Sequence, residues 1–263
     1  MNLEARLRAR RESGARLLVP YVTGGLGPDW TDVVRAVADA GADAIEIGIP
    51  FSDPVMDGPT IQAASVRALQ GGATPTSILR EARSLDVGVP LAVMTYCNLV
   101  FHAGCVRFAE GLRDAGIDGA ILPDLPLGEI DEWAAAADDA GIETVMLAAP
   151  NTPDARLRDI CARSRGFLYG VSLMGVTGER TELAARATEV ARRAKAATDL
   201  PVLLGVGIST PEQAAEATEV ADGVVVGSAL VARLVAGDGP DGAHALVASF
   251  RAALDAAQVG EGP

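Results

Sequence analysis

The segment 43–48 places a glutamate among small and apolar residues, in the order Asp-Ala-Ile-Glu-Ile-Gly. Ile45 and Ile47 alternate with Glu46, which is the period-two pattern of a β-strand. A carboxylate in an otherwise apolar strand is costly to desolvate unless it is paired, hydrated or raised in pKa. Acids in such positions occur in catalytic sites and also in buried ion pairs. Glu46 is therefore a candidate catalytic acid or base, and a buried ion pair is the structural alternative.

The loop after this strand carries two further acids. Pro50 ends the strand, Asp53 and Asp57 follow it, and Pro59 opens a new helix. The segment 43–62 is therefore the first candidate for a chemical site.

Three glycine clusters, at 175–178, 205–209 and 227–228, are candidates for binding phosphate. The second leads into a capping box at 210–213, with proline at the first helical position. The third opens a short helix at 229–231. Backbone N–H groups at helix starts that are free of side chains bind phosphate well. Tight turns are the structural alternative, but three such clusters favour a phosphate site.

Composition limits the chemistry that this chain can perform. Its single lysine, Lys195, lies in a polar helical segment rather than at a strand end, so neither a Schiff-base aldolase nor a pyridoxal-phosphate enzyme has a suitable lysine. His102 with Cys97 and Cys105 matches no structural zinc spacing, and the second histidine, His244, is far from it in sequence. We therefore expect no metal and no cofactor in this chain, with carboxylates running the chemistry.

A net charge of −13 argues against nucleic acid and anionic membranes as partners, because both require clustered positive charge. The segment 1–16 is typical of an amphipathic helix with Leu3 and Leu7 on one side, and it lacks the apolar stretch of a signal peptide. No run approaches 18 apolar residues. Three cysteines without a CxxC pair fit a reducing compartment. These features predict a cytoplasmic protein.

A repeated unit positions the candidate residues. The triplet Asp-Ala-Gly closes a helical segment at 39–41, 114–116 and 139–141, each time just before an apolar strand, and its glycine suits the left-handed residue after a helix. The expected strands are 17–22, 43–48, 90–95, 118–122, 143–148, 167–172, 201–206 and 222–226. The expected helices between them include 29–40, 106–115, 130–140, 155–164, 183–197 and 211–218.

Eight apolar strands alternating with helices in 263 residues predict a parallel sheet closed into a (β/α)8 TIM barrel, with an open doubly wound sheet as the alternative. We expect one domain over 1–263, with a helix at 1–16 and a short flexible tail at 259–263. The carboxyl ends of barrel strands share one mouth, so Glu46, Tyr96, Asn98 and Asp124 should lie there with the glycines. For Asp124 we expect a structural role, in which its side chain accepts backbone N–H bonds in its loop.

The stretches 46–54 and 56–62 closely resemble the signature of the tryptophan synthase alpha chain family, and the similarity runs from Val19 to Ser228. The resemblance implies a lyase of tryptophan biosynthesis that splits indole-3-glycerol phosphate, with Glu46 and Asp57 catalytic. It implies substrate contacts from Tyr21, Met94, Tyr96, Ile121, Tyr169, Thr177, Gly178, Gly207, Gly227 and Ser228. It also implies a face for a beta chain that includes Asp53, Pro54, Asn98 and Phe101.

The family's retro-aldol reaction explains the two acids. A glutamate of raised pKa can protonate indole C3 and take the proton of the adjacent side-chain hydroxyl. An ionised aspartate can accept a hydrogen bond from the indole N–H. By resemblance the protein is an alpha-beta-beta-alpha heterotetramer, with pyridoxal phosphate only in the beta chain. A free-standing lyase, and a module that mainly activates a beta chain, remain alternatives.

Overall fold

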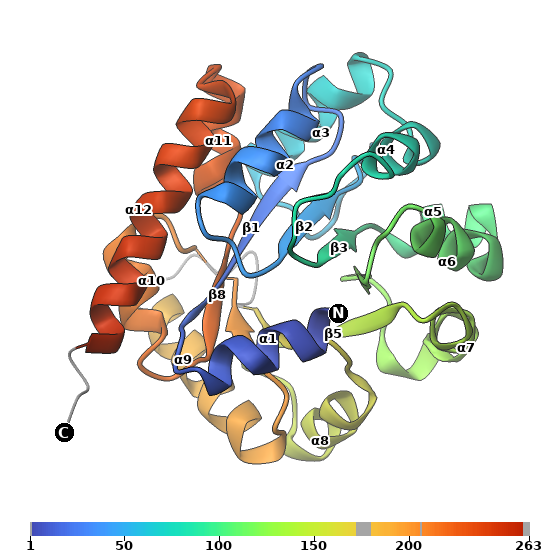
Figure 1. Ribbon diagram of the computed structural model, residues 1–263. Coiled ribbons are helices and arrows are strands. Elements are labelled where there is room, and N and C mark those ends of the chain that lie inside the picture. The colour runs from blue at the N-terminus through green and yellow to red at the C-terminus, as the bar shows by residue number, and fades with distance from the viewer. Residues whose placement is uncertain (1, 172–179, 206, 260–263) are drawn as a thin grey trace.

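A closed barrel of parallel strands forms the centre of the computed structural model, which describes residues 2–171, 180–205 and 207–259. Within these residues eight strands pair in chain order, and β8 pairs back onto β1 (Figure 1). The strands are β1 (Leu17–Thr23), β2 (Ile45–Gly48), β3 (Leu91–Met94), β4 (Gly119–Ile121), β5 (Glu143–Ala148), β6 (Leu168–Gly170), β7 (Val202–Leu204) and β8 (Gly223–Val226). The predicted (β/α)8 fold is confirmed, and the open sheet is excluded.

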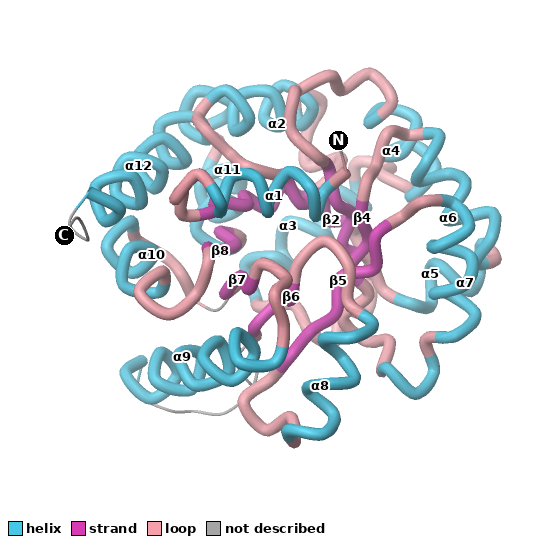
Figure 2. Tube along the Cα trace, turned by 60° about the horizontal axis from the view of Figure 1, so that its bottom comes forward, coloured by secondary structure: helices cyan, strands magenta, loops and turns pink. Residues whose placement is uncertain are grey.

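Helices surround the strands (Figure 2). Those in the described residues are α1 (Leu3–Glu12), α2 (Trp30–Asp39), α3 (Pro59–Gln70), α4 (Pro75–Ala82), α5 (Cys97–Ala103), α6 (Cys105–Asp114), η1 (Leu127–Glu129), α7 (Asp131–Ala140), α8 (Asp154–Arg163), α9 (Arg180–Ala197), α10 (Pro211–Ala217), α11 (Ser228–Ala236) and α12 (Gly239–Val259). Sequence patterns did not predict α4, α5, η1 or α12. The helix predicted at 229–231 is longer than expected and ends at Ala236, and the other predicted helix ends agree within a few residues. No helix in these ranges is long and apolar enough to cross a membrane.

Both faces of each strand are buried, which is why the strands read as apolar runs. On β1, Leu18 and Val22 pack outward against the helix layer, whereas Leu17 and Val19 point into the barrel. The same alternation turns Glu46 of β2 inward, opposite Tyr21 in the register of the β1–β2 pair. Period-two alternation therefore decides which side chains the barrel encloses.

The extra N-terminal helix α1 closes the end of the barrel where the strands begin. Leu3 and Leu7 are fully buried among the inward side chains, and Gly119 lacks the Cβ that would lie 2.8 Å from Leu3 Cδ2. The N–H of Glu4 donates to Glu143 Oε2 at 2.8 Å. With this end closed, the opposite end of the barrel is the one that can hold a site.

The Asp-Ala-Gly triplets end α2, α6 and α7 as expected. Their glycines, Gly41, Gly116 and Gly141, have φ of 101°, 75° and 75°. Only glycine adopts this left-handed region without steric cost, so the chain can turn from each helix directly into β2, β4 and β5.

Candidate active site

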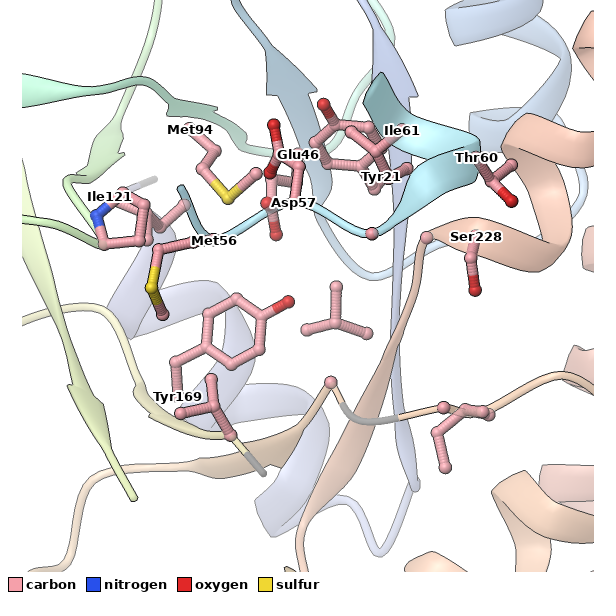
Figure 3. Close-up of a pocket in the computed structure, with 18 of the residues that line it drawn as sticks. Tyr21, Glu46, Met56, Asp57, Thr60, Ile61, Met94, Ile121, Tyr169 and Ser228 are labelled. Atoms are coloured by element: carbon pink, nitrogen blue, oxygen red, sulfur yellow. The ribbon is translucent and has the colours of Figure 1, made fainter. Parts of the chain in front are cut away.

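A cavity of about 430 Å³ lies among the carboxyl ends of the strands (Figure 3). It brings together residues from widely separated parts of the sequence. The predicted site residues that line it are Tyr21, Glu46, Asp57, Met94, Ile121, Tyr169, Gly207, Gly227 and Ser228.

Glu46 is the buried acid of this cavity. Its side chain points inward from β2, the residue is 1% exposed, and Oε2 has no hydrogen-bond partner among the described residues. Burial, and then the nearby charge of Asp57, raises the pKa of Glu46 to about 8. A basic partner would lower the pKa of Glu46, and none of the described residues forms an ion pair with it, so the ion-pair alternative lacks support. A carboxyl group with this pKa is mostly protonated at neutral pH and can act as an acid.

Asp57 enters the cavity from the loop between β2 and α3. It is more accessible than Glu46, and the Gln62 Nε2 donates to its backbone oxygen at 2.9 Å. Burial raises the pKa of Asp57, while a hydrogen bond from the Tyr96 hydroxyl acts to lower it. Of two interacting acids in unequal surroundings, the more accessible one ionises first, and its charge then keeps the other protonated. The pair therefore combines a carboxylate at Asp57 with a carboxylic acid at Glu46.

Two tyrosines, Tyr21 and Tyr169, contribute to the wall of the cavity (Figure 3), and each packs closely against a glycine. A Cβ on Gly48 would lie 1.8 Å from Tyr21 Oη, and one on Gly205 would lie 2.1 Å from Tyr169 Cε2. Burial first, and then the nearby carboxylates, raises the pKa of both phenols above the usual range. Both phenols therefore stay uncharged, and the lack of a side chain at Gly48 and Gly205 makes room for the two rings.

Apolar side chains complete the cavity near the two acids. Met94 and Ile121, which were predicted from the resemblance, lie at the ends of β3 and β4. The lining also includes Gly205 and Ile208 from the predicted glycine cluster at 205–209, and Met56, Gly58, Pro59, Thr60 and Ile61 from the candidate segment 43–62. Sequence analysis missed Pro123, Leu147, Val171 and Val225. Counting inward positions by twos from Glu143 and Gly223 would have found Leu147 and Val225, because each shares the inward face of its strand.

The cavity also reaches the backbone of Gly207, Gly227 and Ser228. Gly227 immediately precedes α11, whose first residue is Ser228, and no side chain caps this helix start. Gly207 has φ of +60°, and nothing lies within 4 Å of the position that its Cβ would take. The exposed N–H groups and the helix dipole of α11 suit an anion. The predicted Thr177 and Gly178, together with the first glycine cluster, lie outside the described residues.

We expect Gly207→Val to raise the KM for a phosphate ester at least tenfold with a smaller effect on kcat. A β-branched residue is strained at φ of +60° and adds bulk to an open part of the cavity. Calorimetric titration with glycerol 3-phosphate measures this directly. Gly72→Val, at φ of +86° and also without neighbours, is the matched control for backbone strain outside the cavity. Equal ligand affinity in Gly207→Val and wild type would place the phosphate elsewhere.

Tyr96 does not line the cavity with the other predicted substrate contacts. It is 3% exposed and lies behind Asp57, with its ring stacked on Phe51 at a centroid distance of 5.1 Å. Asp124 has the structural role expected of it, because it accepts the N–H of Cys97 at 2.9 Å.

The residues predicted to face a partner lie outside the cavity, on the β2–α3 loop and on α5. Asp53 and Asn98 are exposed and Pro54 is partly exposed, while Phe101 is 41% exposed. Val55, in the same loop, is 74% exposed and was not predicted.

Lys195 is held by an ion pair with the buried Asp222, away from the cavity. Cys105 and Cys161 are buried and Cys97 is partly buried. Among residues 2–171, 180–205 and 207–259, no group of three or more histidine, cysteine or acidic side chains is arranged to hold a metal ion.

The sequence profile described as "Tryptophan synthase alpha chain" matches residues 7–257. The chain belongs to the tryptophan synthase alpha chain family. One relative, a tryptophan synthase alpha chain from Streptomyces coelicolor, is 43% identical over 96% of this chain and 94% of its own length. The alpha chain from Synechocystis is 41% identical over 90% of this chain and 92% of its own.

Solved structures of this family share the fold. Tryptophan synthase from Mycobacterium tuberculosis superposes with a TM-score of 0.88 at 37% identity, covering 96% of this chain and 97% of that one. The tryptophan synthase alpha subunit of Legionella pneumophila gives a TM-score of 0.88 at 35% identity, covering 97% and 99%. The likeness therefore extends over the whole barrel of the family.

Proposed function

We propose that this chain is the alpha subunit of a tryptophan synthase and cleaves indole-3-glycerol phosphate to indole and glyceraldehyde 3-phosphate. The observation that carries the proposal is the unequal pair of acids, a buried Glu46 with its pKa raised to about 8 beside the more accessible Asp57. Membership in the tryptophan synthase alpha chain family supports the same reaction.

Glu46 carries both proton transfers. Its carboxylic acid protonates indole C3, which turns the ring into an electron acceptor. The resulting carboxylate takes the proton from the hydroxyl on the adjacent side-chain carbon. The C–C bond then breaks, its electron pair returns to the ring, and an aldehyde forms. Glu46 ends the cycle protonated, so the reaction consumes no external acid or base.

Asp57 stabilises the positive charge that C3 protonation places on the indole ring. Its carboxylate accepts a hydrogen bond from the ring N–H, and the bond strengthens as that nitrogen becomes cationic. Tyr21, Tyr169, Met94 and Ile121 enclose the ring in apolar surroundings, where the charge on Asp57 acts most strongly.

The phosphate binds at the N–H groups of Gly207, in the loop between β7 and α10, and of Gly227 and Ser228 at the start of α11. This scheme requires no metal ion and no cofactor from the chain, which functions as one barrel domain. Because the only lysine is already paired with Asp222, it is not available for a Schiff base.

The partner in this proposal is a tryptophan synthase beta chain, in an alpha-beta-beta-alpha heterotetramer with pyridoxal phosphate in the beta chain. The partner face comprises Asp53, Pro54, Asn98 and Phe101, to which the exposed Val55 adds apolar area. Exposed apolar side chains grouped beside a cavity mouth favour a protein partner.

The direct test is release of indole from indole-3-glycerol phosphate by the purified chain, without added metal or pyridoxal phosphate. We expect turnover by the chain alone and faster turnover with a beta chain. Equal rates with and without it would favour a free-standing lyase. Turnover that appears only with a beta chain would still support an alpha subunit, one that its partner activates. Turnover that stays weak under both conditions would favour a module that mainly activates its partner. No indole under either condition would refute the proposal.

The pH dependence of kcat/KM should be bell-shaped. Glu46 must start protonated, so activity should fall as pH rises through about 8. Asp57 must be ionised, and burial raises its pKa, so activity should also fall on the acid side at a pH above the usual aspartate value. The alkaline limb is not obscured by the substrate, whose phosphate is already fully ionised there. A flat profile between pH 7 and 10 would contradict the role of Glu46.

A further inference from the structure

Side chains hold the loop that carries Asp57. Between Ile49, whose N–H donates to Met94 O, and Gly58, whose oxygen accepts the N–H of Gln62, no backbone–backbone hydrogen bond joins the loop to any described residue. Instead the Met56 N–H donates to Tyr96 Oη at 3.0 Å. The position of the catalytic carboxylate therefore depends on contacts from outside the loop.

The Tyr96 hydroxyl is well placed to provide this support. It accepts the Met56 N–H at 3.0 Å, which fixes the residue next to Asp57, and it lies near enough to the Asp57 carboxyl to lower the pKa of that group. Its ring is buried and stacked on Phe51, which belongs to the same loop. Because Tyr96 is not among the described residues that line the cavity, it acts on the substrate through the loop residues that it holds, Met56 and Asp57.

Asp124 fixes the residue that follows Tyr96. The next residue, Cys97, begins α5, and its N–H donates to Asp124 Oδ1 at 2.9 Å while its Sγ–H donates to Oδ2 at 3.1 Å. Asp124 lies in the loop after β4. Both oxygens of one carboxylate thus fix the residue that follows Tyr96.

We propose that Tyr96 is a positioning residue that holds the Asp57 carboxylate in place, and that Asp124 supports it through Cys97. This inference rests on the proposed function, because Asp57 is catalytic only within it. In this proposal Tyr96 aligns the catalytic acid Asp57 and does not itself contact the substrate. Binding of the phosphate end should be independent of this arrangement, since Gly207, Gly227 and Ser228 lie on other loops.

The first test is Tyr96→Phe, which removes the hydroxyl and keeps the stacked ring. Hydrogen bonds to charged groups are strong enough that we expect kcat to fall by about 10- to 100-fold, with KM changed less than about threefold. Loss of the donor to the Asp57 carboxylate should also move the acid limb of the kcat/KM profile to higher pH. In an Asp57→Asn background, Tyr96→Phe should cost almost nothing further. Unchanged kcat and acid limb, or full additivity with Asp57→Asn, would overturn the proposal.

A second measurement does not depend on turnover. Amide hydrogen exchange at Met56 should be faster in Tyr96→Phe than in wild type, because the acceptor of its N–H is gone. Unchanged exchange would overturn the proposal. If wild type released no indole but exchange responded as expected, the proposed reaction would fail while the support of the loop by Tyr96 stood.

Asp124→Asn provides an independent variant with a matched control. An amide loses the charged acceptor for the Cys97 Sγ–H, so we expect a loss of kcat in the same direction as in Tyr96→Phe, but smaller. The control is Asp118→Asn, since Asp118 accepts the Leu91 N–H at the opposite end of the same strand pair. Equal kcat values for Asp124→Asn and Asp118→Asn would refute the part assigned to Asp124.

Discussion

Glu46→Gln should abolish release of indole while the barrel stays folded. Glutamine keeps the shape of the side chain but cannot give up or accept a proton. One acid–base group contributes about 10²–10⁴-fold to a rate, and Glu46 serves two transfers, so we expect kcat to fall by at least about 10⁴-fold. The measurement is single-turnover indole release at saturating substrate. Activity within a few-fold of wild type would remove Glu46 from the mechanism.

The stability of the same variant gives a control that misfolding cannot imitate. The pKa of Glu46 is raised to about 8 in the fold, mainly by burial, so its contribution to stability is present below the unfolded pKa and is lost as pH rises through about 8. Glutamine does not ionise. The free energy of unfolding of Glu46→Gln should therefore exceed that of wild type above pH 8 and lie closer to it near pH 4. If the free energies of unfolding of the variant and of wild type changed in parallel with pH, Glu46 would not be a buried, protonated acid.

Asp57→Asn should lower kcat by about 10²–10³-fold and leave binding of glycerol 3-phosphate nearly unchanged. Losing one preorganised electrostatic contact to a transition state typically costs this much. The glycines proposed to bind the phosphate lie on other loops, so the affinity measured by calorimetry should be preserved. Intact turnover with weakened phosphate binding would give Asp57 a different role.

The pH profile separates this effect from a general loss of structure. The charge of Asp57 contributes to the raised pKa of Glu46. Asparagine removes that charge, so the residual activity of Asp57→Asn should decline at a lower pH on the alkaline side than wild type does. A misfolded variant would lose activity at every pH, and its alkaline limb would not move to lower pH.

Local patterns were enough to predict the barrel and the position of Glu46. The strands are buried on both faces, so each is a short apolar run, and the Asp-Ala-Gly triplets mark where α2, α6 and α7 end. Alternation within 43–48 is set by backbone geometry alone, which is why the inward direction of Glu46 could be predicted without any distant contact.

Helix α5 and the support of Asp57 required the tertiary structure. The start of α5 has no side-chain cap in its own segment, and Asp124, which is 27 residues away, holds it instead. The loop between β2 and α3 has no periodic pattern of apolar residues. The hydrogen bond from the Met56 N–H to the Tyr96 hydroxyl joins residues that are 40 positions apart in the sequence. Contacts of this length leave no local signal.

The sequence by itself determined the strand alternation, the types of the catalytic residues and the places where chain direction changes, because these depend on neighbours along the chain. Only the tertiary structure decided that Tyr96 does not line the cavity, and that Gly48 and Gly205 make room for two tyrosine rings. Closure of the barrel sets these contacts, since the register between strands fixes which side chains face each other across the interior.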